Sequence, residues 1–340
     1  MPAESPKLNA MTFHAEAFEA PWWLRSAHAQ TIGARLLRRR KPDGVRRERV
    51  TTPDDDFLDL DFHGDFNDPQ AIVLLQHGLE GSALRGYALN VYHELAQFGV
   101  ASVGLNFRSC SGELNRAKRL YHSGETEDTR FVVQLLHERF PAAAIGAIGF
   151  SLGGNALLKY LGEEGEAARL RCAVAVSVPY DLGAGADFLD RSTMGRFYTR
   201  LFVKALVQKS RNKAELIAES CDFERGLHAT SFREFDDAIT APLHGFAHAD
   251  DYYERCSSAQ FLPRIRVPTL LIHSEDDPFL PRRAIPYSNM AANPQLQAVI
   301  TKTGGHVGFI HGSPVMPRFW AEQTAARFLA AALAPTAPAR

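Results

Sequence analysis

The sequence predicts an α/β protein with a mostly parallel, doubly wound sheet that carries helices on both faces. Apolar runs of strand length alternate with helical patterns over much of the chain, an order typical of βαβ units. Residues 71–75 and 145–150 are nearly continuous apolar runs, as expected for strands that helices cover on both sides. The 340 residues are enough for one large domain with a substantial core.

The predicted elements follow one another in a regular order up to residue 179. Residues 57–62 alternate apolar and polar side chains, which predicts a half-buried antiparallel strand. Gly99 and Pro141 limit the first two helices. The remaining elements are expected at 71–75 (strand), 87–98 (helix), 100–105 (strand), 125–139 (helix), 145–150 (strand), 155–161 (helix) and 171–178 (strand).

The alternation stops after Pro179 and resumes later in the chain. Residues 183–264 are helical in pattern and rich in charged and aromatic side chains, and strands follow at 267–273 and 296–300. A helical insertion between two strands of one sheet explains this order without a second domain. We therefore expect a lead-in over residues 1–20, a single domain over 21–333 with a helical cap at about 183–264, and a disordered tail over 334–340.

Composition excludes several classes of protein. The formal net charge is −1, which argues against a nucleic-acid-binding protein. The basic cluster within residues 35–49 is followed directly by Asp54, Asp55 and Asp56, and we interpret it as a solvated face with its own counter-charges. No apolar run reaches the ~18 residues of a membrane span. The first ten residues lack the apolar core of a secretory signal, so a cytoplasmic location is expected.

Cysteine and histidine spacing gives no sign of a metal site or cofactor. The four cysteines are widely separated and form no CxxC pair, which argues against both a disulfide framework and a zinc site. His244 and His248 have the i,i+4 spacing of two helical ligands, but the glutamate of an HExxH motif is missing. We expect neither a metal nor a cofactor.

The pentapeptide Gly149-Phe150-Ser151-Leu152-Gly153 is the most informative motif of the chain. Its Gly-x-Ser-x-Gly form, between a predicted strand and a predicted helix, is that of a nucleophile elbow. The sharp turn brings the residues two before and two after the serine close together, so both must be glycine. The motif predicts that Ser151 is a catalytic nucleophile.

A serine nucleophile needs a histidine base and a carboxylate that orients it. In the fold that carries this motif, the order along the chain is serine, acid, histidine, and each residue lies on a loop after a strand. His306, preceded by two glycines, follows the last predicted strand and is the expected base. Asp277, directly before Pro278, is the expected acid, and Asp276 and Glu275 compete with it.

Acyl transfer also requires donors for the oxyanion. The first is expected to be the backbone N–H of Leu152, directly after the nucleophile. The second should come from the loop 76–82, where a His-Gly pair is typical of an oxyanion loop and Leu79 carries the donor. His77 is expected to brace this loop.

Outside the site, a buried polar network is favoured over a substrate clamp for Arg108, Asn115, Arg116, Glu125 and Asp128.

Five segments together resemble the YheT-like α/β-hydrolases, bacterial esterases related to eukaryotic α/β-hydrolase-domain lipases. They are His77–Ser82, Asn106–Gly112, Tyr121–Asp128, Gly149–Asn155 and Asp277-Pro278, and the resemblance runs from about Pro21 to the final helix. It implies an α/β-hydrolase fold and cofactor-free hydrolysis of carboxylic esters by Ser151, Asp277 and His306.

We therefore predict a carboxylesterase or lipase-type hydrolase that acts through an acyl-enzyme on short-to-medium acyl esters or lipid-like esters. An acyltransferase with the same triad and a non-catalytic binding protein that keeps the fold are the alternatives. Peripheral membrane contact through the aromatic cap and the basic cluster is a third open reading. Aromatic residues of the cap could line an acyl pocket or form the cap's own core. The oligomeric state is left open.

Overall fold

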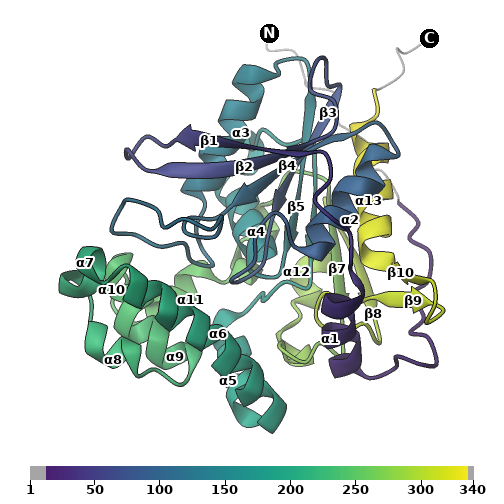
Figure 1. Ribbon diagram of the computed structural model, residues 1–340. Helices are drawn as coiled ribbons and strands as arrows, with labels where there is room; N and C mark the ends of the chain where they lie inside the picture. Colours follow the sequence, from purple (N-terminus) through teal and green to yellow (C-terminus); the bar gives the residue numbers. More distant parts are fainter. Residues whose placement is uncertain (1–12, 336–340) are drawn as a thin grey trace.

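The computed structural model describes residues 13–335, and its centre is an eight-stranded sheet (Figure 1). The strand order is β1-β2-β4-β3-β5-β6-β7-β8. The pairs β1–β2 and β2–β4 are antiparallel and all other neighbours are parallel, which confirms the predicted sheet. The strands are β1 (Val45–Thr51), β2 (Phe57–His63), β3 (Ala71–Gln76), β4 (Ala101–Asn106), β5 (Ala144–Phe150), β6 (Cys172–Val176), β7 (Thr269–Ser274) and β8 (Leu296–Thr301).

Helices cover both faces of this sheet, and each face has its own buried apolar cluster. Two helices, α2 and α13, pack on one face, and α3, α4 and α12 pack on the other. Strands β3 to β7 are fully or almost fully buried because helices cover them on both sides. The helices are α2 (Gly86–Ala96), α3 (Glu127–Arg139), α4 (Leu152–Glu164), α12 (Tyr287–Ala292) and α13 (Trp320–Leu333), with single turns η1 (Gly165–Ala167) and η6 (Arg282–Ala284).

The chain between β6 and β7 forms a group of helices at one end of the sheet, drawn in green at the lower left of Figure 1. This cap contains two small apolar cores of its own. Phe235 and Ile239 pack in one of them, and Tyr252 and Tyr253 pack in the other. Its elements are α5 (Leu182–Arg191), α6 (Thr193–Asn212), α7 (Ala214–Ile217), η2 (Ala218–Ser220), α8 (Phe223–Leu227), α9 (Phe232–Phe235), η3 (Asp236–Thr240), α10 (Ala241–Leu243), α11 (Ala249–Cys256), η4 (Ser258–Gln260) and η5 (Leu262–Arg264).

Four parts of the fold were not expected: helix α1 (Ala27–Leu37), strand β1, helix α12, and the hairpin of β9 (Ile310–Gly312) and β10 (Pro317–Phe319). Strand β1 lies within the basic cluster that was interpreted as a solvated face. The expected counter-charges, Asp54 to Asp56, were wrong for this strand. Arg47 and Arg49 instead pair across the strands with Asp61 and Asp59 of β2.

These cross-strand ion pairs also correct the expectation for β2. It is antiparallel, as predicted, but Phe57–Phe62 are all buried rather than alternately exposed. The carboxylates of Asp59 and Asp61 can lie inside because an arginine of β1 neutralises each of them with two hydrogen bonds.

The expected lead-in is partly described. Residues 13–20 contain no helix or strand, but they pack along α13, where the Trp320 indole N–H donates to the Glu16 carbonyl at 3.1 Å. Residues 1–12 of the lead-in and residues 336–340 of the expected tail lie outside the described residues. Within residues 13–335, none of the helices has both the length and the apolar character needed to cross a bilayer.

Candidate active site

The site begins at the turn between β5 and α4, which has the strained geometry of a nucleophile elbow. Ser151 has φ 52° and ψ −119°, a conformation that L-residues rarely adopt. A methyl group on Gly149 would lie 2.4 Å from the Gly153 carbonyl oxygen, and one on Gly153 would lie 2.5 Å from the Gln76 carbonyl oxygen. Both positions therefore require glycine, as the motif predicted.

Three side chains that are far apart in the sequence meet at this turn. The His306 Nε2 atom lies 2.9 Å from the Ser151 hydroxyl oxygen, and Nδ1 lies 2.8 Å from the Asp277 carboxylate. The Asp277 side chain is fully buried, and its other oxygen accepts the Phe279 backbone N–H at 2.8 Å. With Nδ1–H donating to Asp277, Nε2 is free to accept the serine proton.

Asp276, the competing acid, contacts the backbone of the loop that carries His306 (the histidine loop, residues 304–307) instead of the imidazole. Its carboxylate accepts the Gly305 N–H at 2.9 Å. The same loop is fixed by the Thr31 hydroxyl, which accepts the His306 N–H at 2.9 Å, and by the Ser177 hydroxyl, which accepts the Val307 N–H at 3.0 Å. These three backbone contacts, from three separate segments, thus fix the loop that carries the imidazole.

The two expected oxyanion donors are backbone N–H groups at the start of α4 and in the loop 76–82. Leu152 is the first residue of α4, so its N–H has no partner within the helix. The Gly78 carbonyl accepts hydrogen bonds from the His77 ring at 2.7 Å and from the Gly81 N–H at 3.0 Å. Because the C=O and N–H of a trans peptide point in opposite directions, these bonds turn the Leu79 N–H away from them. The loop lies against Ser151, since a methyl group on Gly78 would be 3.3 Å from the Ser151 Cβ.

His77 braces this loop in the way the sequence predicted. Its Nε2 accepts the Phe107 N–H at 3.1 Å, so its Nδ1 carries the proton that it donates to Gly78. The ring is buried, and burial lowers its pKa to about 3. His77 is therefore neutral, as these two hydrogen bonds require.

Aromatic rings cover the imidazole on the cap side. The ring of Phe279 stacks on that of His306 at a centroid distance of 4.3 Å, and Tyr198 and Phe202 of α6 pack on Phe279 at 4.7 and 5.9 Å. The cap aromatics therefore differ in their surroundings. Tyr252 and Tyr253 form the cap's own core, whereas Tyr198 and Phe202 lie near the site.

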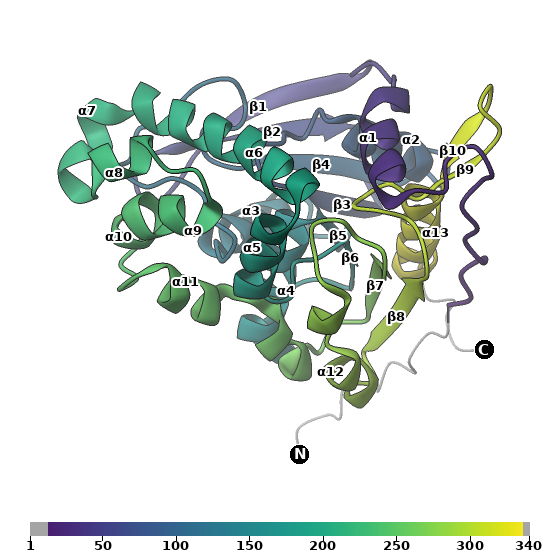
Figure 2. The ribbon, with the colours of Figure 1, turned by 90° about the horizontal axis from the view of Figure 1, so that it is seen from below.

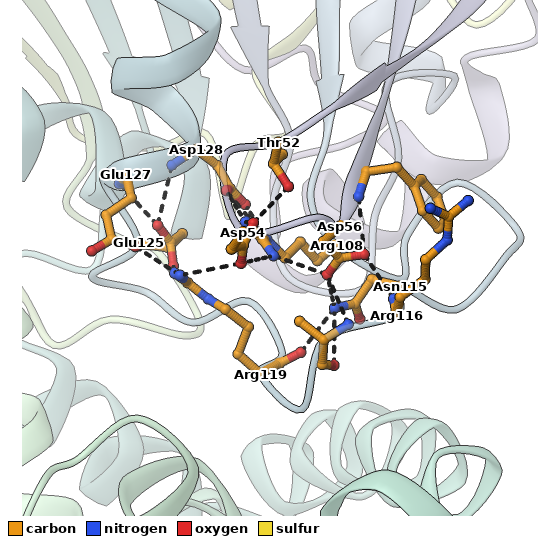
Figure 3. A network of polar contacts seen from close by, with 12 residues as sticks. Thr52, Asp54, Asp56, Arg108, Asn115, Arg116, Arg119, Glu125, Glu127 and Asp128 are labelled. Atoms are coloured by element: carbon orange, nitrogen blue, oxygen red, sulfur yellow. Dashed lines mark hydrogen bonds and ion pairs between the residues drawn. The ribbon is translucent and has the colours of Figure 1, made fainter.

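The polar side chains after β4 form a buried network, as the sequence predicted (Figure 3). The Arg108 guanidinium lies within 2.9 Å of three carboxylates, those of Asp54, Asp56 and Asp128. Asn115 donates to Asp56, and Glu125 pairs with Arg119. Arg116 contributes only its backbone N–H. The cluster lies between the sheet and the cap and does not touch the Ser151–His306 pair.

The described residues contain no cluster of three or more histidine, cysteine or carboxylate side chains that could hold a metal ion. The i,i+4 pair considered in the sequence is not on one helix. His244 follows the last residue of α10, and His248 is the N-cap of α11, where its Nδ1 accepts the Asp251 N–H at 3.2 Å.

Several residues of the site were missed. Phe279 was not proposed, although it directly follows Asp277-Pro278. Thr31 and Ser177 hold the histidine loop but lie far from it in the sequence, and no local signal marks them. Lys209 of the cap contacts Glu80 in the oxyanion loop at 2.6 Å, a relationship that only the fold creates.

The comparisons with known proteins identify the fold and the class of enzyme. The family model described as "alpha/beta hydrolase fold" matches residues 71–313. The chain is 38% identical over 303 residues to the Escherichia coli protein "Putative esterase YheT", covering 87% of this chain and 88% of that one. It is 30% identical over 310 residues to the mouse protein "Phospholipase ABHD3", covering 89% of this chain and 75% of the relative. The predicted resemblance is confirmed.

A solved structure with the same fold is an esterase of Pyrococcus furiosus. It has a TM-score of 0.57 and 19% sequence identity, and the match covers 85% of this chain and 91% of the esterase. The sheet order, the family match and the relatives, which match over most of their length, all agree. The chain belongs to the alpha/beta hydrolase fold family and is an enzyme of the hydrolase class.

Proposed function

We propose that the protein hydrolyses carboxylic esters through an acyl-enzyme formed on Ser151. The observation that supports this most directly is the continuous hydrogen-bonded line from Asp277 through His306 to the Ser151 hydroxyl. A serine hydroxyl alone is a poor nucleophile, and this arrangement is the one that activates it.

In the proposed reaction the Ser151 oxygen attacks the ester carbonyl while His306 Nε2 takes the hydroxyl proton. Asp277 stabilises the resulting imidazolium and keeps its orientation. The oxyanion of the tetrahedral intermediate accepts hydrogen bonds from the backbone N–H groups of Leu79 and Leu152. His306 then protonates the leaving alcohol, and the acyl group remains on Ser151.

Water completes the cycle. His306 removes a proton from the water molecule, whose oxygen attacks the acyl carbonyl, and a second tetrahedral intermediate forms at the same donors. Its collapse releases the carboxylic acid and returns the proton from His306 to Ser151. No external oxidant, reductant or metal is needed for either step.

The substrates proposed are short-to-medium acyl esters or lipid-like esters. The rings of Phe279, Tyr198 and Phe202 form an apolar wall beside His306, which suits an apolar acyl chain. Relatives named esterase and phospholipase support the same class of substrate.

The test is a panel of p-nitrophenyl esters of increasing acyl length, assayed with the wild type and with Ser151→Ala. We expect activity in the wild type and its nearly complete loss in the variant. Ser288→Ala, on the exposed side of α12, is the matched control and should be unaffected. Covalent labelling by a fluorophosphonate should occur in the wild type and in Ser288→Ala only. Wild-type rates in Ser151→Ala would refute the proposal.

A further inference from the structure

One exposed face beside the His306 loop combines apolar and cationic side chains. Helix α1, the Trp22-Trp23 pair before it and the β9–β10 hairpin form this face, which we call the α1–hairpin face (residues 22–40 and 310–319). It holds five of the ten large apolar side chains that residues 13–335 expose, although it contains fewer than a tenth of the residues. They are Trp22, Ile32, Leu36, Val315 and Met316.

Contacts within the face join its segments into one surface. The Trp23 indole N–H donates to the Gly312 carbonyl at 3.0 Å. Gln30 of α1 is buried and exchanges two hydrogen bonds with the backbone of Ile310, at 2.7 and 3.0 Å. The Arg38 guanidinium lies 4.9 Å from the centre of the Phe319 ring. These contacts join the segments that carry the exposed side chains, although Trp22, Val315 and Met316 themselves lie in turns.

The charge on this face is positive. Arg35, Arg39, Arg40 and Arg318 are exposed, and none of them lies within ion-pair distance of a carboxylate in the described part of the chain. Three of them, Arg39, Arg40 and Arg318, line a hollow of about 390 Å³. The acidic residues of that hollow are Glu94 and Glu322, and Glu322 already pairs with the buried Arg38.

We propose that the α1–hairpin face docks on a bilayer that contains anionic lipids. Ile32 and Leu36 lie one turn apart on the exposed side of α1, and Gln30 and Ala34 are its buried residues. Arg35 and Arg39 flank the two apolar side chains. An apolar stripe bordered by arginines is the pattern of a helix that lies in the membrane interface, with its cations at the lipid phosphates.

Two residues at the start of α1 contact the cap and the catalytic loop. Thr31 accepts the His306 N–H at 2.9 Å, and the His28 ring lies 3.0 Å from the Tyr198 hydroxyl of the cap helix α6. Figure 2 shows α1 between the N-terminal end of α6 and the hairpin. Docking through this face would therefore bring the Ser151–His306 edge of the sheet to the lipid surface. The lipid-ester substrate that this implies rests on the proposed function, whereas the docking itself does not.

This surface differs from the one that the sequence suggested. Lipid contact through the cap aromatics was left open; Phe235, Tyr252 and Tyr253 are buried in the cap, whereas Phe197 of α6 is half-exposed. The basic cluster is also divided. Arg47 and Arg49 are engaged in ion pairs on β1, and the exposed arginines of and just after α1 remain for a membrane.

The experiment is co-sedimentation of the full chain with phosphatidylcholine vesicles, with and without phosphatidylglycerol. We expect binding to the anionic vesicles that weakens at high salt, because salt screens the arginines. Leu36→Asp with Val315→Asp should reduce the partition constant on the order of tenfold or more. Arg39→Glu with Arg318→Glu should reduce binding of anionic vesicles to the level of neutral ones.

Phe98→Asp is the matched control, because Phe98 is also half-exposed. It precedes β4 and therefore lies at the N-terminal ends of the parallel strands, whereas Ser151 follows the C-terminal end of β5. This variant should bind like the wild type. Equal binding by all variants, or no binding to either vesicle, would overturn the proposal. So would a dimer in solution that Leu36→Asp dissociates, because a second copy would then cover the face. Binding is measured without turnover, so an inactive esterase would leave this result intact.

Discussion

The Lys209 ammonium of the cap helix α6 lies 2.6 Å from the Glu80 carboxylate in the oxyanion loop. Glu80 follows the expected donor Leu79 directly and has a φ of 50°, which is strained for a glutamate. Tyr121 donates to the same carboxylate at 2.8 Å. The cap is thus tied to the residue that shapes the proposed oxyanion site.

This ion pair predicts that the cap affects catalysis without touching the reacting atoms. Lys209→Met leaves the partly buried Glu80 carboxylate without its cation, so the loop should lose its geometry. We expect kcat to fall about tenfold with little change in KM, because the Leu79 N–H is expected to donate to the oxyanion mainly in the transition state.

The control is Lys204→Met on the exposed side of the same helix, which should keep wild-type kinetics. Steady-state kinetics on one p-nitrophenyl ester, with the active enzyme counted by fluorophosphonate titration, separates a catalytic effect from loss of folded protein. A reduced melting temperature with an unchanged kcat would show that Lys209 acts only on stability.

The two neighbouring aspartates should differ strongly in their effect on the rate. Asp277→Asn leaves Nδ1 of His306 facing an amide and favours the wrong tautomer, so kcat should fall on the order of 10⁴-fold. Asp276→Asn keeps an oxygen for the Gly305 N–H and should lose about tenfold at most. The ratio of the two rates at one pH checks this assignment, and similar losses would contradict it.

Protonation of His77 should destabilise the protein in acid. The pKa of this ring is about 3 in the folded state, because of burial, and about 6.5 when unfolded. The unfolded state therefore binds more protons between these values, so the stabilisation is complete above pH 6.5 and is lost as the pH falls towards 3.

His77→Gln should flatten the dependence of the free energy of unfolding on pH between 6.5 and 3, even if it lowers stability at neutral pH. His93→Gln, at an exposed position of α2, is the matched control for the loss of a histidine. Urea titrations across this range provide the measurement. Parallel curves for the wild type and His77→Gln would exclude His77 as a source of the acid sensitivity.

Arg108 should be the most costly cation of the chain to remove. Arg108→Met leaves the carboxylates of Asp56 and Asp128 buried without their cation, a loss of about 3–5 kcal/mol. Arg46→Met breaks an exposed pair with Glu48 and should cost about 1 kcal/mol or less. Urea unfolding of both variants tests the difference, and equal losses would contradict the importance of the buried network.

Local patterns were enough for most of the sheet and its helices. Apolar runs predicted β3 to β7, because a strand covered on both faces must be apolar along its length. Strand β8 was also predicted, although its side chains are only partly buried. Strand β1 and helix α1 were missed for the converse reason. Their arginines resemble a solvated segment, and only the partners Asp59, Asp61 and Glu322 show which of them are neutralised.

The sequence by itself determined the elbow at Ser151 and the order in which Asp277 and His306 follow it. Steric need for glycine and the chemistry of a serine base are local requirements, so they can be read from a few residues. The tertiary structure alone decided the rest. Whether Asp276 or Asp277 reaches the imidazole, which cap rings stand beside it and which arginines stay exposed all depend on distances between segments far apart in the chain, and these are set by how the whole fold packs.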